Sequence, residues 1–95
     1  MPLYVMLTRL TDQGARTMKQ HPEHIMEVNG QLAEMGVKVL HQFAVLGQYD
    51  FVNVLEAPDA ETIARASLEL GARGSVRIET LAAMAVDQLV DTLKK

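Results

Sequence analysis

Two histidines and the carboxylates beside them are the residues of this chain best suited to metal chemistry. His21 and His24 lie three residues apart around Pro22, with Glu23 and Glu27 close by. On a regular helix, His24 and Glu27 could share a metal ion. The proline places the pair at a helix break, however, and the sequence indicates no third ligand. We therefore interpret these residues as a solvated surface and expect no metal site.

His41 and the Tyr49–Asp50 pair are the candidates for acid–base catalysis. His41 lies among apolar residues with no evident partner, which is typical of a histidine packed beside helices or exposed at a strand edge. Tyr49 and Asp50 are adjacent, and adjacent strand residues point to opposite faces, so they are poorly placed to act on one substrate atom. We expect Asp50 to bond turn amides and Tyr49 to pack. The catalytic residues stay unknown.

Two other polar patterns resemble functional motifs but fit structural roles better. Gly71-Ala-Arg-Gly74 could bind an anion through Arg73. A phosphate-binding loop follows a strand and precedes a helix, and this segment has the opposite order, so we expect a turn. Asp59 and Glu61 could be paired catalytic carboxylates. They open a predicted helix, where acidic side chains cap free amides and face the positive end of the dipole.

Length and composition restrict the class of protein. The 95 residues are 48% hydrophobic and 22% charged, which predicts one globular domain over residues 1–95. The net charge of −3 gives no basic surface and argues against nucleic acid or anionic membranes as partners. There is no cysteine, no signal-peptide pattern and no apolar run long enough for a membrane span. We expect a cytoplasmic protein without a cofactor.

Residues 37–56 predict a β-hairpin around which the chain is organised. Gly47 tolerates φ > 0 and suits the first position of a two-residue turn. Both faces of the hairpin are apolar, so both must be covered, and an odd-numbered loop would exchange them. For an even-numbered loop, the opposed pairs are Leu46 with Tyr49, Phe43 with Val52, Gln42 with Asn53, His41 with Val54, and Leu40 with Leu55.

The other segments predict two helices and two strands around this hairpin, followed by a short C-terminal helix. The expected strands span residues 3–10 and 75–81, and the expected helices span 12–35 with a break at His21–Pro22, 59–70 with a stop at Gly71, and 85–93. The order matches a ferredoxin-like α+β fold with a four-stranded antiparallel sheet. Right-handed crossovers place both main helices on one sheet face. We expect the other face to pair in a dimeric α+β barrel or an oligomer of such dimers.

Several stretches resemble the GYD-domain family. The run Leu46-Gly-Gln-Tyr-Asp50 is similar to its Gly-x-Tyr-Asp signature, and the likeness extends to Tyr4–Thr8, Glu56–Asp59 and Leu70–Gly74. The resemblance implies a small bacterial or archaeal protein with a ferredoxin-like fold. It marks Gly47, Tyr49 and Asp50 as a signature and carries no established activity.

Polar residues expected on the open sheet face form the candidate ligand site. They need partners if they are buried, either in an interface hydrogen-bond network or in a small amphipathic cavity between paired sheets. The candidate ligand-binding residues are Tyr4, Gln42, Asn53, Arg77 and Glu79. The residues assigned to the subunit interface are Met6, Leu40, Phe51 and Leu55.

Two classes of function are consistent with this pattern. The first is a homo-oligomeric binding or interaction module that holds a small ligand or a partner at its sheet faces. The second is a cofactor-free enzyme of the dimeric-barrel type, acting on a small, partly apolar organic substrate, which rests on fold analogy. A deep pocket with an inward histidine or acid would favour the enzyme. A dry interface filled by Phe51 and Leu55 would favour the interaction module.

Overall fold

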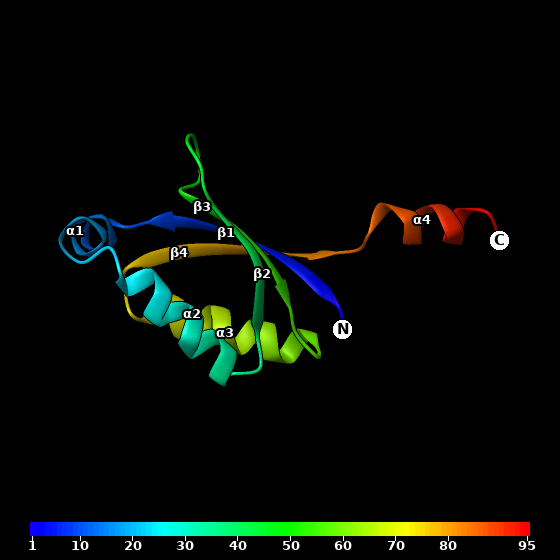
Figure 1. Cartoon of the computed structure of the whole chain (residues 1–95), viewed down its shortest axis with the longest axis horizontal. Helices are drawn as coiled ribbons and strands as arrows, with labels where there is room; N and C mark the ends of the chain where they lie inside the picture. The colour runs from blue at the N-terminus through cyan, green and yellow to red at the C-terminus, as the bar shows by residue number, and fades with distance from the viewer.

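The computed structural model describes residues 1–95 and arranges them in the order β-α-α-β-β-α-β-α (Figure 1). None of the helices combines the length and apolar character that crossing a membrane requires. The strands are β1 (Leu3–Leu10), β2 (Lys38–Ala44), β3 (Phe51–Glu56) and β4 (Val76–Ala83). The helices are α1 (Asp12–Gln20), α2 (His24–Glu34), α3 (Ala60–Ala72) and α4 (Val86–Leu93).

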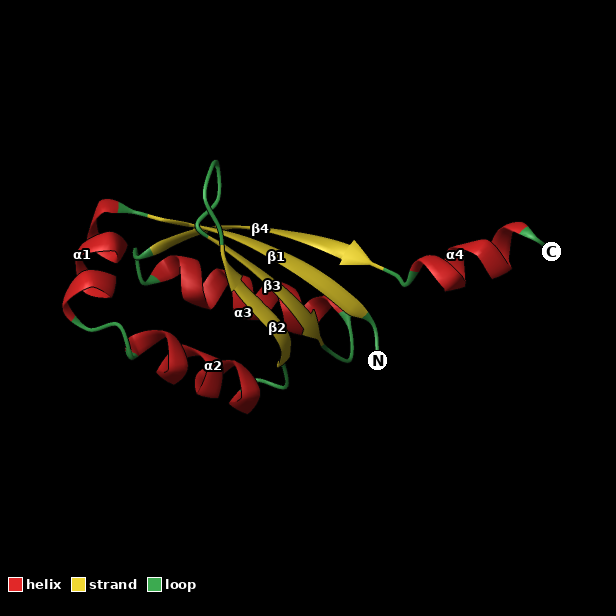
Figure 2. Cartoon of the chain, turned by 45° about the horizontal axis from the view of Figure 1, so that its top comes forward, coloured by secondary structure: helices red, strands yellow, loops and turns green.

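The four strands form one antiparallel sheet in the order β2-β3-β1-β4. Helices α2 and α3 lie side by side on one face of this sheet, and α1 lies at its end (Figure 2). No helix covers the opposite face, which we call the open face. The predicted ferredoxin-like α+β fold is confirmed. Helix α4 projects beyond the end of β4, so the molecule measures 52 × 29 × 19 Å.

Local sequence signals set the starts of two helices, α1 and α3. The Thr11 side chain accepts a hydrogen bond from the Gly14 amide at 3.1 Å and caps α1, and the Asp59 carboxylate accepts one from the Thr62 amide at 2.9 Å and caps α3. The chain breaks between α1 and α2 at the predicted proline. Helix α3 continues one residue past Gly71, so the predicted stop there is wrong. Gly74, at φ +84°, makes the turn into β4 instead.

The hairpin register is largely as predicted. Phe43 faces Val52, Gln42 faces Asn53, and His41 faces Val54. Val39, rather than Leu40, faces Leu55, because a β-bulge between Val39 and His41 leaves Leu40 as an extra residue. The turn is also longer than predicted. The Val45 amide donates to the Asp50 carbonyl at 2.9 Å, so residues 46–49 form the loop, and Leu46 does not pair with Tyr49.

The two sheet faces are exchanged relative to the prediction. Met6 and Leu55, predicted at the subunit interface, are 1% and 0% exposed and lie in the core beneath α2 and α3. Tyr4 lies in the same core, and Phe51 is on the same face. Alternation shows which residues share a face, but both faces are apolar, so the pattern does not tell which one the helices cover. The core cluster is Tyr4, Met6, Leu32, Val37, Leu55, Ala57, Ile63, Ala66 and Leu70.

Candidate functional site

The open face carries an apolar centre with charged residues at both ends. Register places Arg9 beside Arg77 at one end and Lys38 beside Glu56 at the other. Phe43 is 56% exposed at the β2 edge. An exposed apolar patch with a polar rim is typical of a surface that contacts another protein. The apolar side chains of this face are Leu3, Val5, Leu7, Phe43, Val52, Val54 and Leu81.

Tyr49 folds from the β2–β3 loop over the open face. Its hydroxyl donates to Oε1 of Glu79 on β4 at 2.6 Å, and the Arg9 guanidinium lies 5.6 Å from its ring centroid. The hydrogen bond to Glu79 raises the pKa of the Tyr49 phenol above its usual value. The signature tyrosine therefore links the loop to two other strands with a hydrogen bond and a cation–π contact.

Asp50 and Gly47 shape the loop that carries Tyr49. The Asp50 carboxylate accepts a hydrogen bond from the Leu10 amide at 2.8 Å, and its own amide donates to the Thr8 carbonyl at 2.8 Å. Asp50 was predicted to bond backbone amides, and it does so on β1 rather than within its own turn. Gly47 has φ +122°, a conformation that other residues rarely adopt. Both signature residues therefore have structural roles here.

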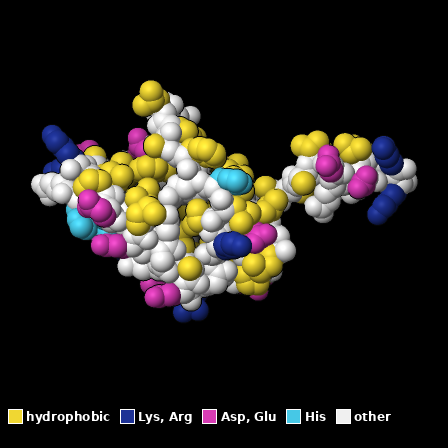
Figure 3. Space-filling model, in the orientation of Figure 1, with side chains coloured by type: hydrophobic (Ala, Val, Ile, Leu, Met, Phe, Trp, Pro, Cys, Tyr) yellow, Lys and Arg dark blue, Asp and Glu magenta, His cyan; other side chains and the backbone are white.

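Helix α4 is amphipathic, and all its residues are exposed. Val86, Leu89, Val90 and Leu93 recur at intervals of three and four, so they lie on one side of the helix. Figure 3 shows the hydrophobic side chains of α4 uncovered in this view. In the isolated chain this apolar stripe faces solvent, which is typical of a helix that packs on a partner.

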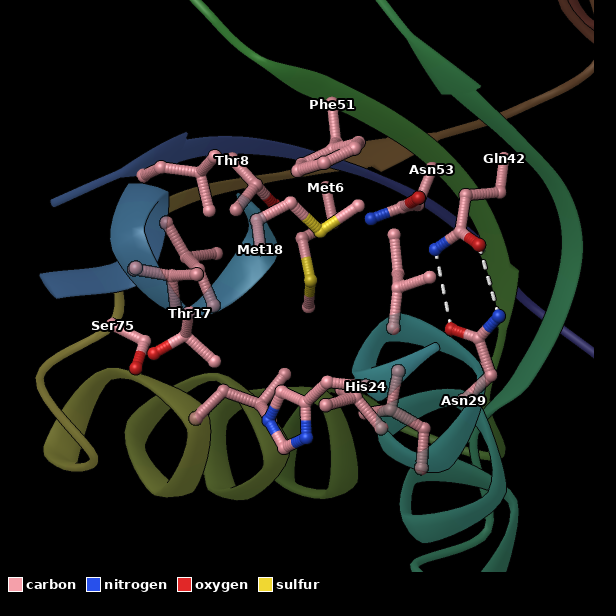
Figure 4. A pocket seen from close by; sticks show the side chains of 18 residues that line it. Met6, Thr8, Thr17, Met18, His24, Asn29, Gln42, Phe51, Asn53 and Ser75 are labelled. Atoms are coloured by element: carbon pink, nitrogen blue, oxygen red, sulfur yellow. Dashed lines mark hydrogen bonds between the residues drawn. The ribbon is translucent and has the colours of Figure 1, made fainter. Parts of the chain in front are cut away.

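A cavity of about 100 Å³ lies between the helix-covered face of the sheet and the helices (Figure 4). Of its 18 lining residues, 10 are hydrophobic, and none is Asp, Glu, Lys or Arg. Gln42 and Asn29 pair through two amide hydrogen bonds of 2.9 and 3.2 Å. Asn53, which is 6% exposed, differs from this pair because its Oδ1 atom has no hydrogen-bond partner.

The histidines of α1 and α2 form a surface cluster with glutamates. His24 Nδ1 lies 3.1 Å from Glu27 Oε2, and His21 Nε2 lies 3.4 Å from Glu27 Oε1. The contacts to His24 and then His21 lower the pKa of Glu27. No group of three or more His, Cys, Asp or Glu side chains has metal-binding geometry. His24 also lines the cavity, without a carboxylate inside it to act as a catalytic partner.

Comparison with known proteins decides the family. A family model described as GYD domain matches residues 4–93. The chain belongs to the GYD domain family. This confirms the resemblance found in the sequence, and the matched residues include the Tyr49 loop described above.

One curated relative of this GYD domain has a name that describes a binding role. It is the "Glutamine synthetase and cystathionine beta-lyase binding protein" of Thermus thermophilus. The two sequences are 54% identical over 95 residues, which covers 99% of this chain and 100% of the relative.

Two solved structures resemble the GYD domain in fold. TTHA0845 from Thermus thermophilus superposes with a TM-score of 0.58 at 22% identity, over 90% of this chain and 95% of that chain. FFRP-DM1 superposes with a TM-score of 0.60 at 19% identity, over 88% of this chain and 100% of that chain. At these identities the likeness supports the fold alone.

The structure divides the predicted ligand residues of the GYD domain between two places. Gln42 and Asn53 line the cavity on the helix-covered face, and Tyr4 is buried in the core there. Arg77 pairs with Arg9 and Glu79 with Leu7, so both project from the open face. The prediction that Arg77 and Glu79 share a side with Tyr4 is wrong, because odd-numbered residues of β4 oppose odd-numbered residues of β1.

Sequence reasoning missed two features of this GYD domain. The first is the link from Tyr49 to Arg9 and Glu79, which depends on how the loop folds back over the sheet. The second is the apolar stripe of α4, whose spacing was visible in the sequence. That spacing predicts an amphipathic helix whose apolar side needs a covering surface, and this is the signal that marks α4 as a contact surface.

Proposed function

We propose that this GYD domain is an interaction module that binds metabolic enzymes, with glutamine synthetase and cystathionine β-lyase as the partners to test. The relative named as a binding protein for these two enzymes supports this proposal. It is 54% identical to the chain, and the alignment covers 99% of the chain and 100% of the relative. The large exposed apolar surfaces of the chain are consistent with binding to proteins.

We assign the enzyme contact to α4. An amphipathic helix that docks in a groove presents anchors at positions i, i+3, i+4 and i+7, and Val86, Leu89, Val90 and Leu93 have this spacing. The helix projects away from the sheet, so a partner can approach its apolar side without displacing the core. A second copy of the chain is the competing occupant, and measurement of mass distinguishes it from an enzyme.

We assign the open face to self-association. Its apolar centre lies on the sheet surface that α2 and α3 leave uncovered, and charges lie at its ends. In this arrangement, two copies of the GYD domain pair through their sheets, and each carries α4 outward. This homo-oligomer is a proposal supported by the exposed apolar side chains, and Phe43 and Leu81 are the most exposed among them.

The test is titration of each purified enzyme with the full chain in a calorimeter, with mass measured by light scattering. Leu89→Glu should weaken enzyme binding by about tenfold or more, because it places a charge among the apolar anchors. Gln88→Glu is the matched control, since it adds the same carboxylate at the neighbouring position and should bind as the wild type does. Binding of neither enzyme would overturn the proposed partners, and equal binding by the two variants would overturn the assignment to α4.

A further inference from the structure

We propose that the cavity between the sheet and the helices binds a small neutral molecule with a compact apolar body and one hydrogen-bonding end, in the class of short branched amides and alcohols. The site lies inside one chain, on the face opposite the proposed pairing surface. No residue of α4 lines the cavity, so it is independent of the proposed enzyme contact, and either proposal can fail without the other.

The size of the cavity limits the ligand. Its volume is about 100 Å³. An apolar cavity of ~150 Å³ accommodates benzene, so this smaller one sets an upper limit of about six non-hydrogen atoms for the ligand. Thioether side chains contribute to the wall, with Met6 from β1 and Met18 from α1 (Figure 4). Methionine adapts to irregular shapes, so the wall can adjust to a branched apolar group.

The polarity of the lining excludes a charged ligand. None of the lining residues is Asp, Glu, Lys or Arg, so an ionised group would enter without a counter-charge. Burial of an unpaired charge is far more costly than burial of a neutral polar group. His24 is the one histidine of the lining, and its Nδ1 atom already contacts Glu27.

Asn53 supplies the polar contact. It is nine-tenths buried, its Oδ1 atom has no partner, and Figure 4 shows its amide nitrogen on the side of Met6 and its oxygen directed away from Met6. An unpaired buried polar atom costs ~1–3 kcal/mol, and proteins pair nearly all such groups. Rotation of the amide by half a turn exchanges its oxygen and nitrogen, so Asn53 can accept from a ligand or donate to it. A ligand with a hydroxyl or a primary amide can both donate and accept a hydrogen bond, so it can pair with Asn53 in either orientation of the amide.

The neighbouring amides explain why Asn53 is the contact. Gln42 and Asn29 are paired with each other through two hydrogen bonds, so their amides do not require a ligand as a partner.

Val28 packs against the core from α2 and also lines the cavity. A larger side chain at position 28 would fill part of the cavity from α2 and leave the Asn53 side chain in place, which gives a second way to block the site.

The experiment uses isobutyramide as the probe and isobutyrate at pH 7 as its charged analogue, with binding followed by NMR of the methionine methyls and the Asn side-chain amides. Isobutyramide should shift the Met6, Met18 and Asn53 signals saturably, and isobutyrate should not. Asn53→Leu should weaken isobutyramide by about tenfold. Val28→Phe should abolish its binding, and amide shift dispersion verifies that each variant is folded.

Three results would overturn the proposal. They are the absence of saturable shifts at Met6 and Met18 in the wild type, equal affinity for isobutyrate, and unchanged isobutyramide affinity in whichever of the two variants is folded.

Discussion

The Tyr49 hydroxyl donates to Oε1 of Glu79 at 2.6 Å and joins the hairpin loop to β4, the edge strand on the opposite side of the sheet. Strands β3 and β1 lie between β2 and β4, so this contact spans the width of the open face. Arg9 of β1 lies beside the same ring. The tyrosine of the Gly-x-Tyr-Asp motif therefore lies with Arg9 and Glu79 at one end of the surface that we propose as the pairing interface.

This contact predicts a pH dependence. The pKa of Tyr49 is raised, first by the hydrogen bond to Glu79, so the folded state favours the protonated phenol. The stability that this hydrogen bond contributes is fully present below the pKa of Tyr49 in the unfolded chain. It is lost as the pH rises through the higher pKa of Tyr49 in the folded chain. Glu79→Gln should lower the Tyr49 pKa toward its ordinary value, as measured by tyrosinate absorbance. Tyr49→Phe assigns the transition, because Tyr4 is the one other tyrosine. An unchanged alkaline transition in Glu79→Gln would show that the carboxylate does not set this pKa.

Asp50 should contribute more to stability than an ordinary loop residue does. Its carboxylate accepts the Leu10 amide, which would otherwise lack a partner at the end of β1. Asp50→Ala should lower the free energy of unfolding by ~1–3 kcal/mol. Asp50→Asn keeps an acceptor and should cost less, as measured by urea denaturation. Equal losses in the two variants would mean that the bond to Leu10 is not the source of the effect.

Gly47 should tolerate substitution worse than its neighbour Gln48. It has φ +122°, and a Cβ atom there would meet nothing within 4 Å, so backbone strain alone sets the cost. Gly47→Val should destabilise by ~1–3 kcal/mol. Gln48→Val should stay within ~0.5 kcal/mol of the wild type, because Gln48 is exposed in the loop. The comparison is made by thermal unfolding, and equal melting temperatures would contradict the positive φ.

The sequence predicted those parts of the fold that depend on neighbouring residues. Thr11, Asp59 and Pro22 act within one helical turn, so their effects on the helices follow from local chemistry. The pairing of Gln42 with Asn53 follows from the even-numbered loop even though its length was wrong. Contacts between residues far apart in the sequence leave no local pattern of this kind. A Cβ atom on Gly14 would lie 1.9 Å from the Ser75 carbonyl oxygen, a close approach of α1 to the start of β4 that is invisible in the sequence.

The candidate site was only partly predicted. The alternation of side chains groups residues by sheet face, but it does not show which face the helices cover. Gln42 and Asn53 were correctly placed together, and their assignment to the open face was wrong. Both faces of β1 and β3 are apolar, so no residue type distinguished the covered face from the open one. The bulge at Leu40 added a second error at the hairpin end, since an extra residue shifts the pairing without changing the apolar pattern.

The exchanged faces give a direct test of the proposed pairing. Val52 opposes Leu7 and Phe43 on the open face, whereas Phe51 lines the cavity beneath the sheet. Val52→Asp should therefore dissociate the oligomer and leave a folded subunit, because it places a carboxylate at the centre of the apolar surface. Phe51→Asp should instead destabilise the subunit by several kcal/mol, roughly the loss expected when a large side chain is removed from a core and a charge is buried. Sedimentation at micromolar concentration measures assembly, with one chain weighing 10.5 kDa, and circular dichroism measures folding. A wild-type chain that sediments as a monomer would contradict self-association, and an intact oligomer in Val52→Asp would show that the copies pair through another surface.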